Sequence, residues 1–460
     1  KLLCITVKNH SNKAIIVWGI GPYENDKVKY IECENELDLI KKFIHFWHKT
    51  QPDVITGWNV QFFDIPYLCN RIIRLLGEKE LKKLSPWGIV KEDTVRHGQY
   101  GKASQKYNLL GVSILDYLDL YRKFTYVNRE SYRLDYIAEI ELGEKKYPNP
   151  YETFREWYTK DYKSFVDYNV QDVELVDKLE DRMKLIELCM TLAYEAKVNL
   201  VDVYSQVRVW DILIYNFLKE RNIVIPRKKV SKKEEKYEGA YVKDPQTGLH
   251  NWVMSFDLNS LYPHLIMQYN ISPETMAREG NGKVNVERML NQEVDIPDDG
   301  YTVTPNGARF RIDKQGFLPQ LMEKFYSDRV KFKKWTLEAK QRYEDSKDKK
   351  YLNEISKYNN IQMARKIALN SAYGAVGNQY FRYYDEKMAT AITTSGQLAI
   401  RWIENDVNDF LNKTLHTKDI SYVVASDTDS IYIRLGEFVN KVFKDKSDNK
   451  KIVKVLDKFC

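Results

Sequence analysis

The sequence predicts a protein of several domains, with an α/β domain first and α+β domains after it. Over residues 1 to about 180, short β-rich runs alternate with helical stretches, which is the pattern of an α/β domain. From Tyr237 onward, segments with the pattern of β-strands precede and follow two long polar helices predicted at 316–376, so strands and helices are segregated along the chain. With 460 residues, the chain is long enough for about three domains.

The elements that justify this class follow in order along the chain. The first part holds the β-rich runs "LLCITV", "KAIIVWGI" and "VSILDYLDLY" and the helical stretch "ENELDLIKKFIHFWHK". A helical connector near 185–225 leads to strands from "YEGAYV" to "WVMSFDL". The two long helices are joined by the charged segment "EDSKDKKYLNE", and strand-like text returns in "VVASDTDSIYI".

Composition places the chain among globular proteins. Hydrophobic residues make up 43% and charged residues 30% of the chain, and no apolar run approaches the ~20 residues of a membrane helix. The 5 cysteines are scattered without a CxxC pair, which argues against a zinc knuckle or a disulfide framework. We therefore expect a soluble protein of a reducing compartment, without a membrane partner. The start at Lys1 suggests a fragment.

Positive charge is concentrated in one segment. Between Leu321 and Asn370, 13 Lys and Arg residues face 7 Asp and Glu residues, so +6 of the formal net charge of +7 lies there. Such a patch indicates contact with phosphates. A solvated helical face gives the same count, so charge alone leaves both interpretations open.

Two carboxylates stand in the middle of the run "VVASDTDSIYI". Its apolar flanks predict two strands and Ser-Asp-Thr-Asp-Ser predicts a tight turn, so Asp427 and Asp429 fall at the tip of a β-hairpin. Turn chemistry alone can account for such acids, because their side chains bond to turn backbone. The alternative is a divalent-cation site, since two close carboxylates repel each other unless a proton or metal intervenes.

A third acid favours the metal interpretation. In "MSFDLNSLYPHLI", Asp257 ends an apolar strand, after which Ser260 and Pro263 suit a turn into a helix. A buried carboxylate costs several kcal/mol unless it is paired or bound to metal. Together with Asp427 and Asp429, it supplies the three carboxylates of a two-metal phosphoryl-transfer site.

The segment "RKIALNSAYGAVGN" predicts a helix with one polar face. Lys366 and Asn370 lie four residues apart, and Tyr373 with Gly374 follows one turn later, which suits a phosphate, an amide contact and a base pair. On the preceding helix, Arg329 and Lys333 also lie four residues apart, so several polar side chains can converge on a triphosphate.

In order and spacing, "SFDLNSLYP", "KIALNSAYG" and "SDTDS" resemble motifs A, B and C of family B DNA polymerases. The resemblance extends to "FDIPYL", "GVSILDYLDLY", "YNVQDVELV", "YEGAYV" and "FRYYDEKMATAIT", so it covers nearly the whole chain and is closest to the T-even phage type. It implies an RNase H-like 3′→5′ exonuclease domain at 1–184, a helical connector at 185–228, palm segments with an antiparallel sheet at 229–315 and 379–460, and a two-helix fingers insertion at 316–378. It also implies that the rest of the palm and the thumb are missing after Cys460.

The resemblance assigns polymerase roles to specific residues. Asp257 and Asp429 would hold two Mg²⁺ ions, with the Leu258 carbonyl as a further ligand and Asp427 at or near the site. Tyr262 matches the steric gate that excludes a ribose 2′-hydroxyl. The residues expected to bind the dNTP are Leu258, Ser260, Leu261, Tyr262, Arg329, Lys333, Lys366, Asn370, Tyr373 and Gly374, and those expected to contact the template are Tyr237, Gly239 and Ala240. Three positions depart from the family pattern: His264, Ala372 and Ser426.

The first 180 residues resemble the proofreading exonuclease. Asp64 and Asp172 match its second and third acidic motifs and would hold further divalent ions, and Tyr168 matches the tyrosine that helps to place the attacking water. The first motif of the family, Asp-x-Glu, is absent from this sequence, and "KLLCITVKNH" resembles the residues that follow that motif in the family.

The implied function is template-directed DNA synthesis with proofreading. The implied partners are primer–template DNA and dNTPs, with a sliding clamp and replisome proteins for the full-length protein. We expect a monomer in the cytoplasm, which for a phage protein is that of the host. Two alternative interpretations remain. The three acids argue against an inactivated primer–template scaffold, and Tyr262 with the exonuclease motifs argues against an RNA-synthesising or reverse-transcribing enzyme.

Overall fold

The computed structural model describes residues 1–96, 103–125, 127–228, 238–443 and 448–459. The chain divides into two compact units, Lys1–Tyr204 and Ser205–Cys460. The division falls inside the segment predicted as a connector, because helix α8 (Leu185–Ala196) contacts the first unit and helix α9 (Gln206–Lys219) contacts the second. Within the described ranges, no helix has the length and apolar character needed to cross a membrane.

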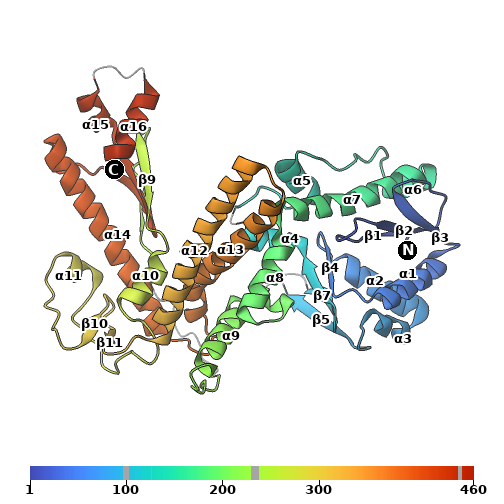
Figure 1. Cartoon of the computed structure of the whole chain (residues 1–460), viewed down its shortest axis with the longest axis horizontal. Helices are drawn as coiled ribbons and strands as arrows, with labels where there is room; N and C mark the ends of the chain where they lie inside the picture. Colours follow the sequence, from blue (N-terminus) through green and yellow to red (C-terminus); the bar gives the residue numbers. More distant parts are fainter. Residues whose placement is uncertain (97–102, 126, 229–237, 444–447, 460) are drawn as a thin grey trace. The chain divides into compact units, whose positions relative to one another are not determined.

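The first unit is an α/β domain (Figure 1). Strand β2 pairs antiparallel with β1 and parallel with β3, β4 pairs parallel with β7, and β5 and β6 form an antiparallel ladder. The strands are β1 (Cys4–Lys8), β2 (Ile15–Gly19), β3 (Val28–Glu32), β4 (Val54–Gly57), β5 (Val90–Arg96), β6 (Ala103–Leu109) and β7 (Ser113–Asp116). The remaining elements are α1 (Glu36–Thr50), α2 (Asp64–Leu76), α3 (Glu78–Leu81), η1 (Lys82–Leu84), α4 (Tyr117–Phe124), α5 (Leu134–Leu142), α6 (Phe154–Lys160), α7 (Tyr162–Met183) and η2 (Leu200–Tyr204).

The apolar faces of α1 and α2 form the core of this unit against Trp18 of β2. Helix α1 begins where the Asn35 side chain accepts a hydrogen bond from the Asp38 N–H, so a capping residue fixes its start. The expectation that "VSILDYLDLY" is one β-rich run is wrong after its fifth residue, Asp116. Asp116 ends β7 and its carboxylate accepts the Leu118 N–H, which starts α4 at Tyr117.

The second unit contains an antiparallel sheet in the order β8-β12-β13-β9 and a separate ladder of β10 with β11. Its strands are β8 (Val242–Lys243), β9 (Val253–Asp257), β10 (Tyr301–Val303), β11 (Arg309–Arg311), β12 (Val423–Asp427) and β13 (Ser430–Arg434). Its further helices are α10 (Leu261–Gln268), α11 (Val286–Leu290), α12 (Phe317–Ser346), α13 (Lys350–Val376), α14 (Glu386–Leu415), α15 (Gly436–Val442) and α16 (Asn449–Phe459).

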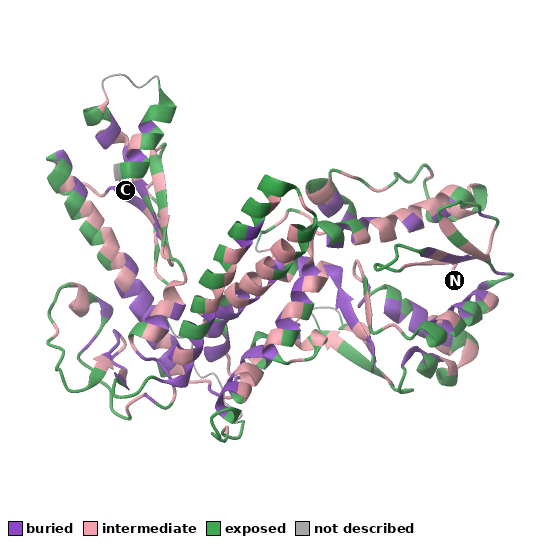
Figure 2. Cartoon of the chain, viewed as in Figure 1, coloured by how far each residue is buried: buried purple, intermediate pink, exposed green. Residues whose placement is uncertain are grey.

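Among the described residues, two hydrophobic clusters hold this unit together. One packs α9 and α10 against the first turns of α12, the second half of α13 and the first half of α14. The other packs one face of the β12–β13 hairpin against the rest of α14, α15 and α16. The burial colours in Figure 2 show the first half of α14 as largely buried, in agreement with its buried run from Met388 to Ile400. The prediction of two long helices after residue 316 is confirmed by α12 and α13, which pack along each other (Figure 1).

Candidate active sites

The ends of three strand segments bring the predicted acids of the second unit to one edge of its sheet. Asp427 ends β12 and pairs with Ser430 of β13, and Ser430 also pairs with Asp257 at the end of β9. The turn between β12 and β13 places Thr428 at a φ of 55°, and the Asp429 N–H donates to the Asp427 carbonyl over 2.6 Å. The predicted hairpin with acids at its tip is confirmed as a structure.

A backbone contact ties the segment after β9 to this turn. The Leu258 N–H donates to the Asp429 carbonyl over 2.7 Å, so the chain leaving Asp257 is held beside the hairpin tip. The Thr428 N–H donates to the carbonyl of Tyr241, next to β8. The turn is thereby fixed from both sides of the hairpin.

The electrostatics of this edge favour a cation. Partial burial raises the pKa of Asp429, and the charges of Asp257 and then Asp427 raise it further. Asp257 and Asp427 are exposed, and none of the three acids forms an ion pair within the part of the chain that the structure describes. Hard oxygen ligands with uncompensated negative charge fit a divalent ion such as Mg²⁺.

Helix α10 begins beside these acids and presents Tyr262 toward two other helices. Its N-terminal flanking residue, Ser260, has a φ of 58°, and Leu261 is the partly buried first residue. The Tyr262 ring lies 4.9 Å from the ring of Tyr373 on α13, centroid to centroid, at an interplanar angle of 62°. Two residues expected at the nucleotide therefore touch across α10 and α13.

The structure links one predicted cation to motif A directly. Arg329 on α12 donates from Nη1 to the Ser260 hydroxyl over 3.1 Å, and its buried Nε has no hydrogen-bond partner among the described residues. Lys333 lies exposed one turn later on the same helix. On α13, Lys366 is half-buried, and Asn370 and Gly374 are exposed. These five residues lie on two adjacent helices, without hydrogen bonds or ion pairs to one another within the described ranges.

The segment predicted to contact the template is held by α14. Thr393 donates from Oγ1 to the Glu238 carbonyl over 2.8 Å, and Gln397 donates to the Gly239 carbonyl over 2.7 Å. Gly239 and Ala240 are exposed, and Tyr237 lies outside the described residues. Sequence reasoning missed Thr393 and Gln397, although they lie in the quoted "ATAIT" and just beyond it, because a helix pattern does not reveal which distant loop it supports.

The three departures from the family pattern have separate surroundings. His264 Nδ1 lies 2.9 Å from the Ser260 carbonyl, and its ring lies 4.5 Å from that of Tyr326 at 79°. Ala372 is buried in the helical core. Ser426 is buried inside strand β12 rather than in the turn, so the turn geometry is set by Thr428 and Asp429.

In the first unit, a buried acid shapes the loop that leads to Asp64. Asp116 is 2% exposed and accepts the N–H groups of Asn59 over 3.0 Å and Gln61 over 2.9 Å. Asp64 then opens α2 as its first residue. Sequence reasoning missed Asp116; its signal was a carboxylate at the end of an apolar strand, the same signal that singled out Asp257.

The carboxyl of Asp64 lies in the field of other acids. Desolvation is the largest cause of a raised pKa, about 6, and the charges of Asp116 and Asp172 add to it. The residue as a whole is exposed, although its carboxyl group is partly withdrawn from water. A carboxyl whose pKa is raised by desolvation and, to a smaller extent, by neighbouring carboxylates is in the state expected of a cation ligand before the cation binds.

Asp172 and Tyr168 lie one turn apart on α7, beside a lysine. Lys146 Nζ lies 2.6 Å from Asp172 Oδ2 and 3.4 Å from the Tyr168 hydroxyl, and 5.2 Å from the centre of its ring. Burial raises the pKa of Asp172, while Lys146 opposes that rise. The other carboxylate oxygen, Oδ1, is buried and has no hydrogen-bond partner among the described residues, so it is available to a cation. Lys146 was missed because it lies in a loop without a recognisable pattern.

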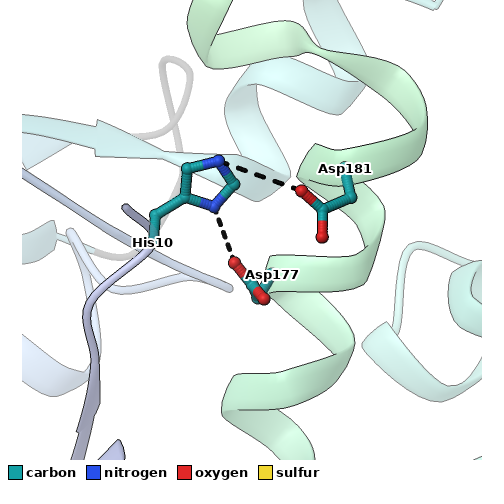
Figure 3. A group of neighbouring side chains, drawn as sticks. All are labelled: His10, Asp177 and Asp181. Carbon is teal, nitrogen blue, oxygen red and sulfur yellow. Dashed lines mark hydrogen bonds and ion pairs between the residues drawn. The ribbon is translucent and has the colours of Figure 1, made fainter. Parts of the chain in front are cut away.

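A second group in this unit has metal-like geometry but different chemistry (Figure 3). Within the described ranges, the one set of three ligand side chains whose ligand atoms all lie within 4.8 Å is His10, Asp177 and Asp181. Lys13 Nζ lies 2.9 Å from oxygens of both acids, and Lys8 Nζ lies 2.9 Å from Asp177. These lysines hold the pKa of Asp177 at about 2 and neutralise the pair, so the group is an ion-pair network that fastens the β1–β2 turn to α7.

Comparison with known proteins identifies relatives of both units. A sequence profile of DNA polymerase family B matches residues 198–454, and a profile of its exonuclease domain matches residues 4–137. The chain is 37% identical over 480 residues to a DNA-directed DNA polymerase of Escherichia phage RB69, covering 95% of this chain and 52% of the relative. It is 35% identical over 483 residues to that of Enterobacteria phage T4, covering 94% and 52%. A DNA polymerase delta catalytic subunit of Candida albicans is 28% identical over 425 residues, covering 88% and 38%. The chain thus spans about half the length of its phage relatives.

Proposed function

The chain belongs to DNA polymerase family B, and on that premise we propose that its full-length protein is a template-directed DNA polymerase with 3′→5′ exonuclease activity. The observation that carries the proposal is the convergence of Asp257, Asp427 and Asp429 at one sheet edge, where partial burial and then the two neighbouring charges raise the pKa of Asp429. The substrates are a primer–template and dNTPs. The first unit supplies the exonuclease site, and the second supplies palm segments and, in α12 and α13, the fingers.

The donor set of the second unit fits two divalent ions, which we take to be Mg²⁺. Asp257 and Asp429 hold them, with the Leu258 carbonyl as a further ligand and Asp427 at or near the site. When bound, such ions lower the pKa of the primer 3′-hydroxyl and neutralise charge on the leaving pyrophosphate. The three carboxylates contribute by concentrating their negative charge where the ions would bind.

The other residues bind and orient the nucleotide. Arg329, Lys333 and Lys366 place positive charge at the triphosphate, and Asn370 adds amide donors. The Ser260 hydroxyl supports this arrangement by accepting the Arg329 Nη1 hydrogen bond. Tyr262 and Tyr373 bound the space for the sugar and the base pair, while Gly374 leaves room beside them. Gly239 and Ala240, held from α14, approach the template backbone.

The exonuclease site uses a separate set of side chains. Asp64 and the unpartnered Oδ1 of Asp172 fit divalent ions, whose chemistry is to activate water for attack on the terminal phosphodiester. Tyr168 orients that water, and Lys146 fixes the Asp172 carboxylate through its 2.6 Å contact. We also propose that the full-length protein is a monomer in the cytoplasm and that it binds a sliding clamp and replisome proteins.

A primer-extension experiment tests the polymerase assignment. Asp257→Ala and Asp429→Ala in the full-length protein are expected to lower single-nucleotide incorporation with Mg²⁺ by a factor on the order of a thousand or more, with primer–template binding retained. Asp409→Ala, an exposed acid on α14, is the control and should match wild type. Incorporation within tenfold of wild type for either acid variant would overturn the assignment and favour a binding scaffold.

A further inference from the structure

A glycine in the interior of α14 lies against the proposed sugar gate. Gly396 is buried near the middle of this 30-residue helix. Glycine is among the least favourable residues in a helix interior, because it loses the most backbone freedom on folding. Its backbone does not adopt a positive φ, so conformation does not require a glycine there.

The space around position 396 does require a glycine. A Cβ added at Gly396 would lie 2.9 Å from Cε1 and 3.6 Å from Cδ1 of Tyr262, and 3.7 Å from Cδ2 of Leu261. The first of these distances is shorter than a carbon–carbon contact allows. Any side chain at position 396 would therefore displace the Tyr262 ring.

The ring is bounded on a second side as well. Its centroid lies 4.9 Å from that of Tyr373, which belongs to α13 rather than α14. Tyr262 is carried by α10, which packs against α12, α13 and α14. A ring displaced by a side chain at position 396 therefore changes its packing against Tyr373, the residue assigned to the base pair.

We propose that Gly396 is a positioning residue for sugar selection: the missing side chain lets the Tyr262 ring lie against α14, at the depth that admits a deoxyribose. This inference rests on the proposed polymerase function and deepens it. Tyr262 touches the sugar, and Gly396 acts only through the ring. The depth of the gate is then set by a helix that is far from motif A in sequence.

A double-mutant cycle tests whether the glycine acts through the ring. Four full-length proteins are compared: wild type, Gly396→Ala, Tyr262→Ala and the double variant. The measurement is kcat/KM for a matched dNTP and the corresponding rNTP on one primer–template. Gly282→Ala is the matched control, because a Cβ there meets nothing within 4 Å and the residue lies outside the proposed sites.

We expect Gly396→Ala to lower kcat/KM for the dNTP about tenfold in the presence of Tyr262, since a small misplacement of a positioning group has large kinetic effects. In the Tyr262→Ala background, the same change should alter kcat/KM less than twofold, because no ring remains to be displaced. The thermal midpoint should fall for Gly396→Ala alone and recover in the double variant, where alanine improves the helix. Gly282→Ala should match wild type.

Two results would overturn the inference. An equal loss in both backgrounds would show that Gly396 serves the helix itself, and no loss in either would show that the ring tolerates a side chain. Failure of the gate assignment is distinguishable from both. In that case, Tyr262→Ala by itself would leave the ratio of dNTP to rNTP efficiency unchanged, whatever the coupling with position 396.

Discussion

The two acidic sites of this chain hold their carboxylates in different ways. In the first unit, Asp172 projects from the interior of a helix and carries a lysine at 2.6 Å. In the second, Asp257 and Asp427 end strands, are exposed, and lack an ion pair within the part of the chain that the structure describes. A carboxylate that is withdrawn from water needs a counter-charge, whereas one at a solvent-exposed strand end is hydrated until a ligand arrives.

This difference in built-in positive charge indicates how much charge compensation each site needs from its ligands. The proposed exonuclease site contains part of its own positive charge, so Lys146 can fix Asp172 before substrate binds. The proposed polymerase site leaves its acids uncompensated among the described residues, and the cations proposed to bind the triphosphate lie on α12 and α13. Three predictions test the two sites, from the largest effect to the smallest, and a fourth tests the ion-pair network of the first unit.

The first prediction separates the two activities. Asp64→Ala or Asp172→Ala in the full-length protein should reduce 3′→5′ degradation of single-stranded DNA by a factor on the order of a thousand or more, because each removes a ligand charge from the reaction centre. Incorporation of dNTPs should stay within twofold of wild type. The control is Glu174→Ala on the same helix α7. Equal loss of both activities would show that the two acidic sites are not independent.

The second prediction concerns Tyr262. Tyr262→Ala should raise the relative efficiency of rNTP incorporation about a hundredfold, close to 3 kcal/mol of lost discrimination, because a ring excludes a 2′-hydroxyl by volume. If the ring were only a packing residue, both substrates would lose efficiency together and the protein would be less stable. The ratio of kcat/KM for dNTP and rNTP decides between the two.

The third prediction tests the internal charge of the exonuclease site. Lys146→Ala should slow the exonuclease about tenfold, since Asp172 loses the contact that orients it, and should leave primer extension unchanged. Lys145→Ala is a matched control, because its exposed side chain pairs with Glu139 instead. An exonuclease rate equal to wild type for Lys146→Ala would show that the site does not depend on a built-in cation.

The fourth prediction concerns the ion-pair network of His10, Asp177 and Asp181. The pKa of Asp177 is lowered from 3.8 to about 2 in the folded protein, so its contribution to stability is present above pH 4 and is lost as the pH falls toward 2. Asp177→Asn should cost about 2 kcal/mol at neutral pH and remove this acid dependence. Hydrogen exchange of β1, β2 and α7 against pH provides the measurement, with Asp181→Asn, the more exposed acid, giving a smaller effect.

Local pattern predicted much of the architecture. The apolar flanks of Asp427 and Asp429 predicted the hairpin, the apolar run before Asp257 predicted the end of β9, and polar periodicity predicted α12 and α13. These predictions are correct because the alternation of apolar and polar residues and helical spacing are properties of residues close together in the sequence. The same logic went wrong at "VSILDYLDLY", where a carboxylate cap at Asp116 outweighed the β-prone residues after it.

By itself, the sequence determined the acids, the polar faces of two helices and the family to which the chain belongs. The side chains that support these residues are visible only in the tertiary structure. Lys146 forms an ion pair with Asp172, Gln397 donates a hydrogen bond to the Gly239 carbonyl, and Gly396 lies against the Tyr262 ring. Each of these contacts joins segments at least 26 residues apart. A local pattern carries no information about such a contact, because it depends on how apolar faces pack and on the space that packing leaves.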